Sequence, residues 1–203
     1  MTTRSTSLRD CLRAATREAH EQFDAAFRPS LPSWSPGHYA TLLTLLHSLH
    51  ASADPLLATW QGATWQGATA GFPPVPARTA PFLADLTVLG IRPGTPLDLG
   101  DLPHDGPGQV TQPAAFGLLY VVAGSSLGGR TVLKLLPPTM APSARNGLSA
   151  CGSQPATAVW QATLALLAAP RSAADTNEAI DAARLVFTKL LERLAPLAAV
   201  AAP

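Results

Sequence analysis

Residues 12–20 read LRAATREAH, and this stretch carries the first pattern that predicts the fold and a candidate site. At about 100° per residue, Arg13, Arg17 and His20 fall on one strip of a helix, at positions i, i+4 and i+7. The neighbouring apolar stripe consists of Leu8, Leu12, Ala15, Ala19 and Phe23. A half-buried imidazole can bind a metal, and guanidiniums bind carboxylates. The alternative is a solvated face of arginines beside a histidine that only packs, and this stretch alone leaves both interpretations open.

Composition and length favour one helical domain that spans residues 1–203. Hydrophobic residues make up 47% of the chain and charged residues only 13%, which is typical of helices with broad buried faces. The net charge of +1 gives no electric field that would hold nucleic acid or an anionic membrane. There is no apolar leader and no run of about 20 apolar residues, so we expect a cytoplasmic protein with neither partner. Two cysteines, Cys11 and Cys151, are too few for a disulfide framework.

Prolines and glycines divide the chain into helical blocks, and strand-like alternation is nearly absent, so the fold class is predicted to be all-α. Ser7 is a plausible N-cap for the first helix, and Pro55 should kink or end the second. The pentad TWQGA, which occurs twice within 59–69, is interpreted as an extended loop or an irregular helix end. Residues 90–113 are expected to form a long surface loop, and the tail after Pro196 is expected to fray. Helices are predicted at about 7–27, from 36 onward, and at about 81–89, 112–136, 155–169 and 175–194.

The predicted helix over 112–136 is unusually rich in glycine. Four glycines occur within residues 117–129, and each costs about 1 kcal/mol relative to alanine inside a helix. Gly117, Gly124 and Gly128 share one face, where bare backbone lets a flat ligand or another helix lie close. The Gly128-Gly129 pair would let the helix bend over such a ligand. Close helix packing through the small pair Gly124 and Gly128 is the alternative interpretation.

Taken together, the two segments resemble the haem oxygenase family, most closely its bacterial biliverdin-producing branch. Residues 12–20 resemble the family's proximal helix, and residues 117–129 resemble its glycine-rich distal helix. The resemblance implies a multi-helix haem oxygenase-like fold in which His20 ligates the iron of haem, while Arg13 and Arg17 face the propionates. Further haem-binding candidates are Tyr120, Gly124, Gly128 and Lys134.

The resemblance also implies an activity, the oxidative cleavage of haem to biliverdin, carbon monoxide and ferrous iron. Haem would be both cofactor and substrate. O2 would be consumed, and electrons would come from an external donor such as a ferredoxin or a reductase, because no nucleotide-binding glycine fingerprint follows a strand. The distal glycines would direct oxygen towards one edge of the macrocycle, while serine hydroxyls would anchor water. The catalytic candidates are Gly124, Ser125, Ser126, Gly128 and Gly129.

Two departures from the family pattern affect these expectations. Ser125 stands where animal members carry an aspartate, a difference that bacterial members also tolerate. A second pair of basic residues is expected near Trp160, but residues 160–167 carry no charge. Half of the propionate clamp is therefore missing from this helix, and Lys134, Arg130 or Arg184 would have to substitute. A non-catalytic haem-binding or interaction protein that keeps the fold is the alternative function.

Other enzyme classes find less support in the sequence. A di-iron carboxylate site needs Glu-x-x-His motifs, and no glutamate here is followed three residues later by histidine. His47 and His50, at i and i+3, lack nearby carboxylate or cysteine partners for a mononuclear metal site, so they are interpreted as ordinary helix residues. A thiol enzyme would need a base near Cys11 or Cys151, and none lies in sequence range.

Overall fold

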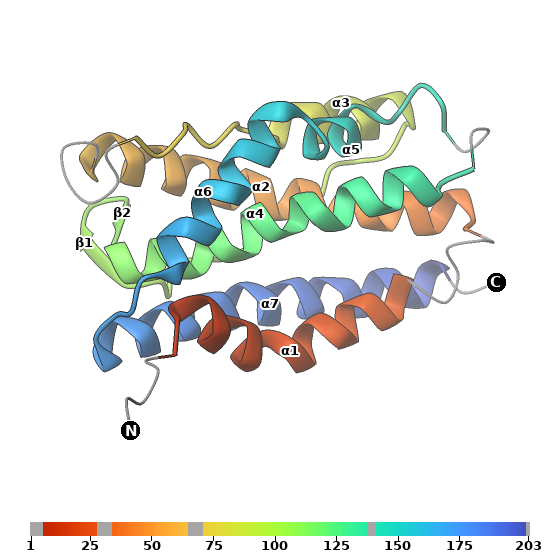
Figure 1. Cartoon of the computed structure of the whole chain (residues 1–203). Helices are drawn as coiled ribbons and strands as arrows, with labels where there is room; N and C mark the ends of the chain where they lie inside the picture. Colours follow the sequence, from red (N-terminus) through yellow and green to blue (C-terminus); the bar gives the residue numbers. More distant parts are fainter. Residues whose placement is uncertain (1–5, 28–33, 65–70, 138–140, 202–203) are drawn as a thin grey trace.

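The computed structural model describes residues 6–27, 34–64, 71–137 and 141–201, without the side chains of 63–64 and 196–201. Helices account for most of these residues, which confirms the all-α prediction (Figure 1). Two short strands, the three-residue β1 (His104–Gly106) and the two-residue β2 (Gln109–Val110), form a small antiparallel hairpin. The helices are α1 (Leu8–Phe27), α2 (Pro36–Thr64), α3 (Thr79–Val88), α4 (Gln112–Leu135), α5 (Asn146–Cys151), α6 (Gln154–Ala168) and α7 (Ala173–Ala201).

Helix α1 begins as its sequence predicts. The Oγ of Ser7 accepts a hydrogen bond from the backbone N–H of Asp10 at 3.2 Å and donates one to its carboxylate at 2.7 Å. These bonds satisfy groups that the first turn of a helix leaves without intrahelical partners. Leu8, Leu12 and Thr16 form the buried face, and the Thr16 hydroxyl donates to the Leu12 carbonyl. The helix therefore packs along the stripe that its sequence indicates.

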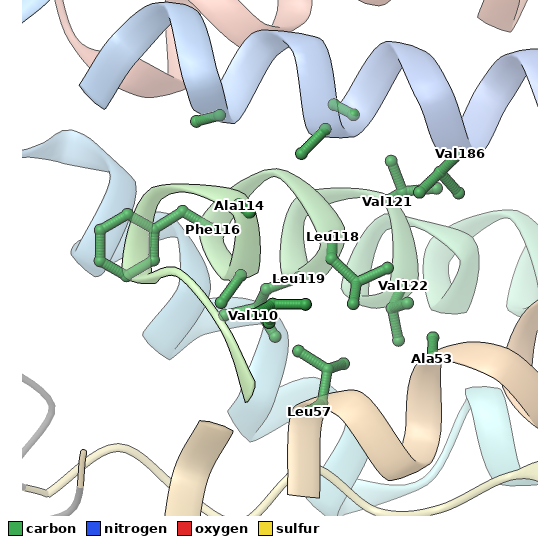
Figure 2. Packing of buried hydrophobic residues seen from close by; sticks show 14 of the residues in the cluster. Ala53, Leu57, Val110, Ala114, Phe116, Leu118, Leu119, Val121, Val122 and Val186 are labelled. Carbon is green, nitrogen blue, oxygen red and sulfur yellow. The ribbon is translucent and has the colours of Figure 1, made fainter. Parts of the chain in front are cut away.

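Helix α4 is the central element of the fold and contacts α2, α5, α6 and α7. By length and composition it could cross a membrane, but half of its apolar window is buried inside the protein, as expected for a core helix. Figure 2 shows the packing on two of its sides, with Val186 of α7 beside Val121 and with Ala53 of α2 near Val122. The apolar composition of α4 thus follows from its burial between helices.

Helices α1 and α7 lie side by side and run in the same direction (Figure 1). The Arg184 Nε atom of α7 donates to the carbonyl of Ala15 in α1, at 3.3 Å. Further along both helices, the ring centroids of His20 and Phe187 are 6.0 Å apart, with the rings in an edge-to-face arrangement. This register brings Ala15 and His20 of α1 beside Arg184 and Phe187 of α7, which no local sequence pattern connects to them.

The second helix and the repeat that follows it correct two predictions. Pro55 does not end α2, which continues to Thr64. Residues on both sides of the proline are buried, including Ala53, Leu57 and Trp60, and this burial outweighs the backbone hydrogen bond that proline cannot donate. Of the two alternatives for the repeated pentad, the first copy, residues 59–63, therefore belongs to the end of a helix and not to an extended loop, and residues 65–68 of the second copy lie outside the described residues.

Three predictions about connections and ends also need correction. Residues 90–113 are not only a surface loop, because they contain the β1–β2 hairpin and bury Leu97, Leu99 and Leu102. The short helix α5 was not predicted. Helix α7 does not end near residue 194 but continues past Pro196 to Ala201. In the loop the buried leucines pack into the main core cluster, which compensates for its lack of regular structure.

A buried histidine–aspartate contact within α2 also holds the start of α3. The His50 ring, which is fully buried, places its Nδ1 atom 3.0 Å from the Asp54 carboxylate. The other Asp54 oxygen accepts hydrogen bonds from the backbone N–H groups of Arg78 and Thr79 and from the Thr79 hydroxyl. His50 therefore has a carboxylate partner, which corrects the expectation that it lacks one. The Asp54 carboxylate thereby connects α2 to the first residues of α3.

This pair predicts how stability depends on pH. Burial lowers the pKa of His50 below the ordinary value of 6.5, and the contact with Asp54 opposes that shift only in part. Burial lowers the pKa of His47 as well. The unfolded chain therefore takes up protons before the folded one, so stability is complete above the ordinary histidine pKa and is lost as the pH falls below it. We expect a smaller free energy of unfolding in urea at about pH 5.5 than at about pH 7.5. Equal values at both pH values would contradict this assignment.

Candidate functional site

A cavity of about 380 Å³ lies between α1, α4 and α7, with α2 and α6 completing its walls. Helix α1 contributes His20, and α4 contributes residues between Tyr120 and Val132. Helix α2 contributes only leucines to the wall. The lining residues are His20, Phe23, Asp24, Phe27, Leu42, Leu46, Leu49, Tyr120, Val121, Gly124, Ser125, Leu127, Gly128, Gly129, Thr131, Val132, Trp160, Phe187 and Leu190.

His20 stands on the α1 wall of the cavity with 61% of its side chain exposed. Its Nδ1 atom lies 3.5 Å from the Asp24 carboxylate, one helical turn further on, and its ring meets the edge of Phe187. A carboxylate near one ring nitrogen holds the imidazole in a fixed orientation and leaves the other nitrogen for a ligand. The histidine at the margin of the apolar stripe is thus oriented by one neighbour and packed by another.

The glycine face of α4 serves two different purposes along its length. A Cβ atom added at Gly117 would lie 2.1 Å from the Ala179 carbonyl oxygen of α7, so this glycine permits close helix packing. At Gly124 the nearest atom to such a Cβ is Trp160 Cζ3, at 3.9 Å, and at Gly128 no atom lies within 4 Å. The predicted shared face therefore packs on α7 at its beginning and opens onto the cavity about two to three turns later.

The remaining candidates of α4, which are Gly129, Ser125 and Ser126, face different neighbours. Gly129 lines the cavity, but its added Cβ would lie 2.9 Å from the sulfur of Cys151, so it lets α5 approach α4. Ser125 lines the cavity, and its hydroxyl donates to the Val122 carbonyl at 2.7 Å. Ser126 does not line it. The residue lines a separate hollow instead, and its buried hydroxyl has no hydrogen-bond partner within the described part of the chain.

This second hollow, here called the side recess, has a volume of about 200 Å³ and lies between α4, α5 and α6. Trp160 and Leu127 line both the side recess and the main cavity. The lining residues of the side recess are Ser126, Leu127, Arg130, Cys151, Ala156, Thr157, Trp160 and Gln161.

The structure places the predicted basic residues outside the cavity wall. Arg13 and Arg17 are exposed on α1, and Lys134 is exposed in the last turn of α4. Arg184 lies against the same turn of α1 as Ala15, one turn before the cavity-lining residue Phe187. Because α1 and α7 are parallel, Arg13, Arg17 and Arg184 precede the His20–Phe187 level on the two helices. Tyr120 lines the cavity as an α4 residue.

The sequence pattern does not identify several residues that line the cavity. Asp24 is four residues after His20, so helical spacing could have identified it as the partner of that imidazole. Phe187, which is 167 residues away from His20 in the chain, gives no local signal. The α2 residues Leu42, Leu46 and Leu49 fit the pattern of any buried helix face. Trp160 was noted only for the lack of charge around it.

The geometry of the described residues does not favour the alternative functions, a metal-cluster enzyme or a thiol enzyme. In residues 6–27, 34–64, 71–137 and 141–201, no three histidine, cysteine, aspartate or glutamate side chains are grouped as metal ligands. Cys11 is half-buried and Cys151 is buried. Burial raises the pKa of Cys151, an effect that the neighbouring Arg78 opposes only in part, so the thiol form is favoured over the nucleophilic thiolate.

The fold and the cavity define an all-α protein with a slot, walled by a histidine on one helix and by bare glycine backbone on another. A solved structure with this fold is the NO- and CO-bound haem oxygenase from Neisseria meningitidis. The match covers 95% of this chain and 92% of that protein, with 20% identity and a TM-score of 0.64, and it shows that the two share a fold. No protein-family model matches the sequence, and no curated protein matches it either.

Proposed function

We propose that the chain is a haem oxygenase of the bacterial, biliverdin-producing kind, which cleaves haem to biliverdin, carbon monoxide and ferrous iron. The observation that carries the proposal is the cavity itself, with His20 on one wall and the open positions of Gly124 and Gly128 on another. Bare backbone lets a flat ligand lie close to a helix, and a histidine is one of the side chains that hold haem iron. Likeness in fold to the Neisseria meningitidis haem oxygenase supports the same activity.

The lining fits haem in its chemical character. The apolar part of the wall, which includes Phe27, Leu42 and Leu46, suits the hydrocarbon edge of a porphyrin. Polar groups, including His20, Asp24 and Ser125, occur elsewhere on the wall. With Asp24 beside Nδ1, the Nε2 atom of His20 would be the iron ligand.

The turn that precedes His20 would supply the anion-binding groups. Arg13 and Arg17 on α1, together with Arg184 on α7, place up to three guanidiniums near one end of the two parallel helices. Guanidiniums form charge-assisted hydrogen bonds with carboxylates, so this end would receive the propionates. Arg184 would then replace the missing basic pair near Trp160. Lys134, in the last turn of α4, lies at the other end of the α4 cavity wall and is a weaker candidate.

Bound haem supplies the iron at which O2 is activated and the carbon skeleton that is opened. The residues of the chain position it and control access. His20 would hold the iron from the α1 side, and the backbone at Gly124 and Gly128 would leave room for a diatomic ligand on the α4 side. The Ser125 hydroxyl, already donating to Val122, can accept a hydrogen bond from water and so hold a proton source in the cavity. Electrons would come from an external ferredoxin or reductase.

One observation favours the alternative, a haem-binding protein without turnover. No lysine or arginine lines the cavity within the described part of the chain, and Ser126, one of the two serines expected to anchor water, faces the side recess instead. A ligand held by fewer charges is less firmly oriented, and cleavage of one carbon bridge requires a fixed orientation.

Turnover separates the two functions. The purified protein is loaded with ferric haem and given ascorbate or a reductase system in air, and the visible spectrum is followed. Loss of the Soret band with the appearance of a biliverdin absorbance, and release of carbon monoxide, is the result expected for the enzyme. A stable haem complex that yields no biliverdin would favour the binding protein, and the absence of any complex would overturn both.

A further inference from the structure

Trp160 separates two hollows of the protein. On one side it lines the main cavity together with Tyr120 and Gly124, and on the other it lines the side recess together with Ser126. The side chain is half-buried and belongs to α6, which crosses in front of α4 in Figure 1. An indole is the largest side chain available for such a partition, and it has few rotatable bonds.

The indole also sets the space in front of Gly124. Its Cζ3 atom lies 3.9 Å from the position of an added Cβ at Gly124, which is ordinary van der Waals contact. A ligand that lies on the bare backbone of α4 therefore meets the tryptophan at that point. At Gly128, one turn further along, no atom of the protein occupies the corresponding space. The open part of the glycine wall is thus bounded by Trp160 on the α6 side.

Helix α6 can orient a ligand in the main cavity through steric contact. Residues 160–167 carry no charge that would hold a propionate, and the side recess behind the indole provides unused room. Ser126 of α4 lines this room as well. Without the indole, a ligand could shift from the main cavity into the side recess.

We propose that Trp160 is a specificity-determining residue, which blocks the side recess and thereby fixes the sideways position of a flat tetrapyrrole on the glycine wall. The inference rests on the proposed function in that it takes haem as the ligand. It adds which residue limits the shape of the tetrapyrrole.

The test compares the binding of two ferric porphyrins without turnover. One is haem, and the other is an iron porphyrin with a phenyl group at one meso carbon. The wild-type protein should bind haem at least about 10-fold more tightly than the bulky porphyrin, and Trp160→Ala should reduce this ratio to below about 3-fold, because the side recess then accepts the substituent. Trp160→Phe should stay close to the wild type. Leu164→Ala, one turn further along α6 and outside both hollows, is the matched control and should keep the wild-type ratio.

The outcomes separate this inference from the function on which it rests. Haem binding by the wild type with an unchanged ratio in Trp160→Ala would overturn the role of Trp160 and leave the proposed function standing. A folded Trp160→Ala protein that binds neither porphyrin would also overturn it, since removing a partition should not close the cavity. Failure of the wild type to bind haem would overturn the proposed function itself. Should Trp160→Ala not fold, Trp160→Leu is measured and judged in the same way.

Discussion

Gly117→Ala is expected to destabilise the protein by about 1–3 kcal/mol, the range typical of an overpacked helix contact. The added Cβ would lie 2.1 Å from the Ala179 carbonyl oxygen and 3.0 Å from the backbone nitrogen of Ala183. Backbone atoms of α7 cannot rotate away as a flexible side chain can, so the two helices must separate. Because α4 and α7 form the core contact from which the cavity opens, their separation is costly.

Urea unfolding followed by circular dichroism measures this loss. Gly128→Ala is the matched control on the same helix, because no atom lies within 4 Å of its added Cβ. Alanine is favoured over glycine in a helix interior by about 1 kcal/mol, so the control should equal or exceed the stability of the wild type. Equal stability of Gly117→Ala and Gly128→Ala would contradict the assignment of Gly117 to close packing.

Gly124→Leu is expected to weaken the binding of ferric haem about 100-fold, which corresponds to about 3 kcal/mol, while the fold is retained. The leucine side chain would extend from the α4 wall into the cavity, where a Cβ has only ordinary contact with Trp160. A flat ligand cannot share that space, so it would be excluded by steric overlap. Stability should not fall, since leucine has a higher helix propensity than glycine.

Haem titration and urea unfolding, carried out on the same preparation, test this prediction. Gly117→Ala supplies the comparison, because its expected defect is in stability rather than in the cavity wall. Loss of binding by Gly124→Leu with unaltered unfolding locates the ligand on the glycine wall. Wild-type affinity in Gly124→Leu would place the ligand elsewhere.

The helices could be predicted from sequence where local chemistry decides them. The Ser7 cap, the stop near Phe27 and the long apolar helix from Gln112 to Leu135 all follow from caps, prolines and periodicity. Pro55 was misjudged because the burial of Leu57 and Trp60 on the far side of the proline is a tertiary effect. The hairpin and helix α5 are short, and short elements carry little periodic signal.

The candidate site could be predicted only in its local parts. The strip that ends in His20 and the glycines of α4 can be recognised along single helices, and the cavity brings His20 together with Gly124 and Gly128 but leaves out Arg13 and Arg17. The sequence does not distinguish Gly117, which permits close packing, from Gly124, which opens onto the cavity. Both lie on one face of α4 and differ only in which residues lie opposite them. Phe187 and Trp160 are contributed by distant segments, so only the fold places them in the wall.

The central claim is that His20 binds the iron of haem in this cavity, and the visible spectrum during titration with ferric haem tests it most directly. We predict a one-to-one wild-type complex with the Soret band of an imidazole-ligated haem. In His20→Ala this band should shift and weaken, and added imidazole should restore it. The affinity for haem should fall by at least about 100-fold, because changing even a residue that only supports a metal ligand costs about 10–100-fold in metal affinity. A His20→Ala complex with the affinity and spectrum of the wild type would contradict the claim.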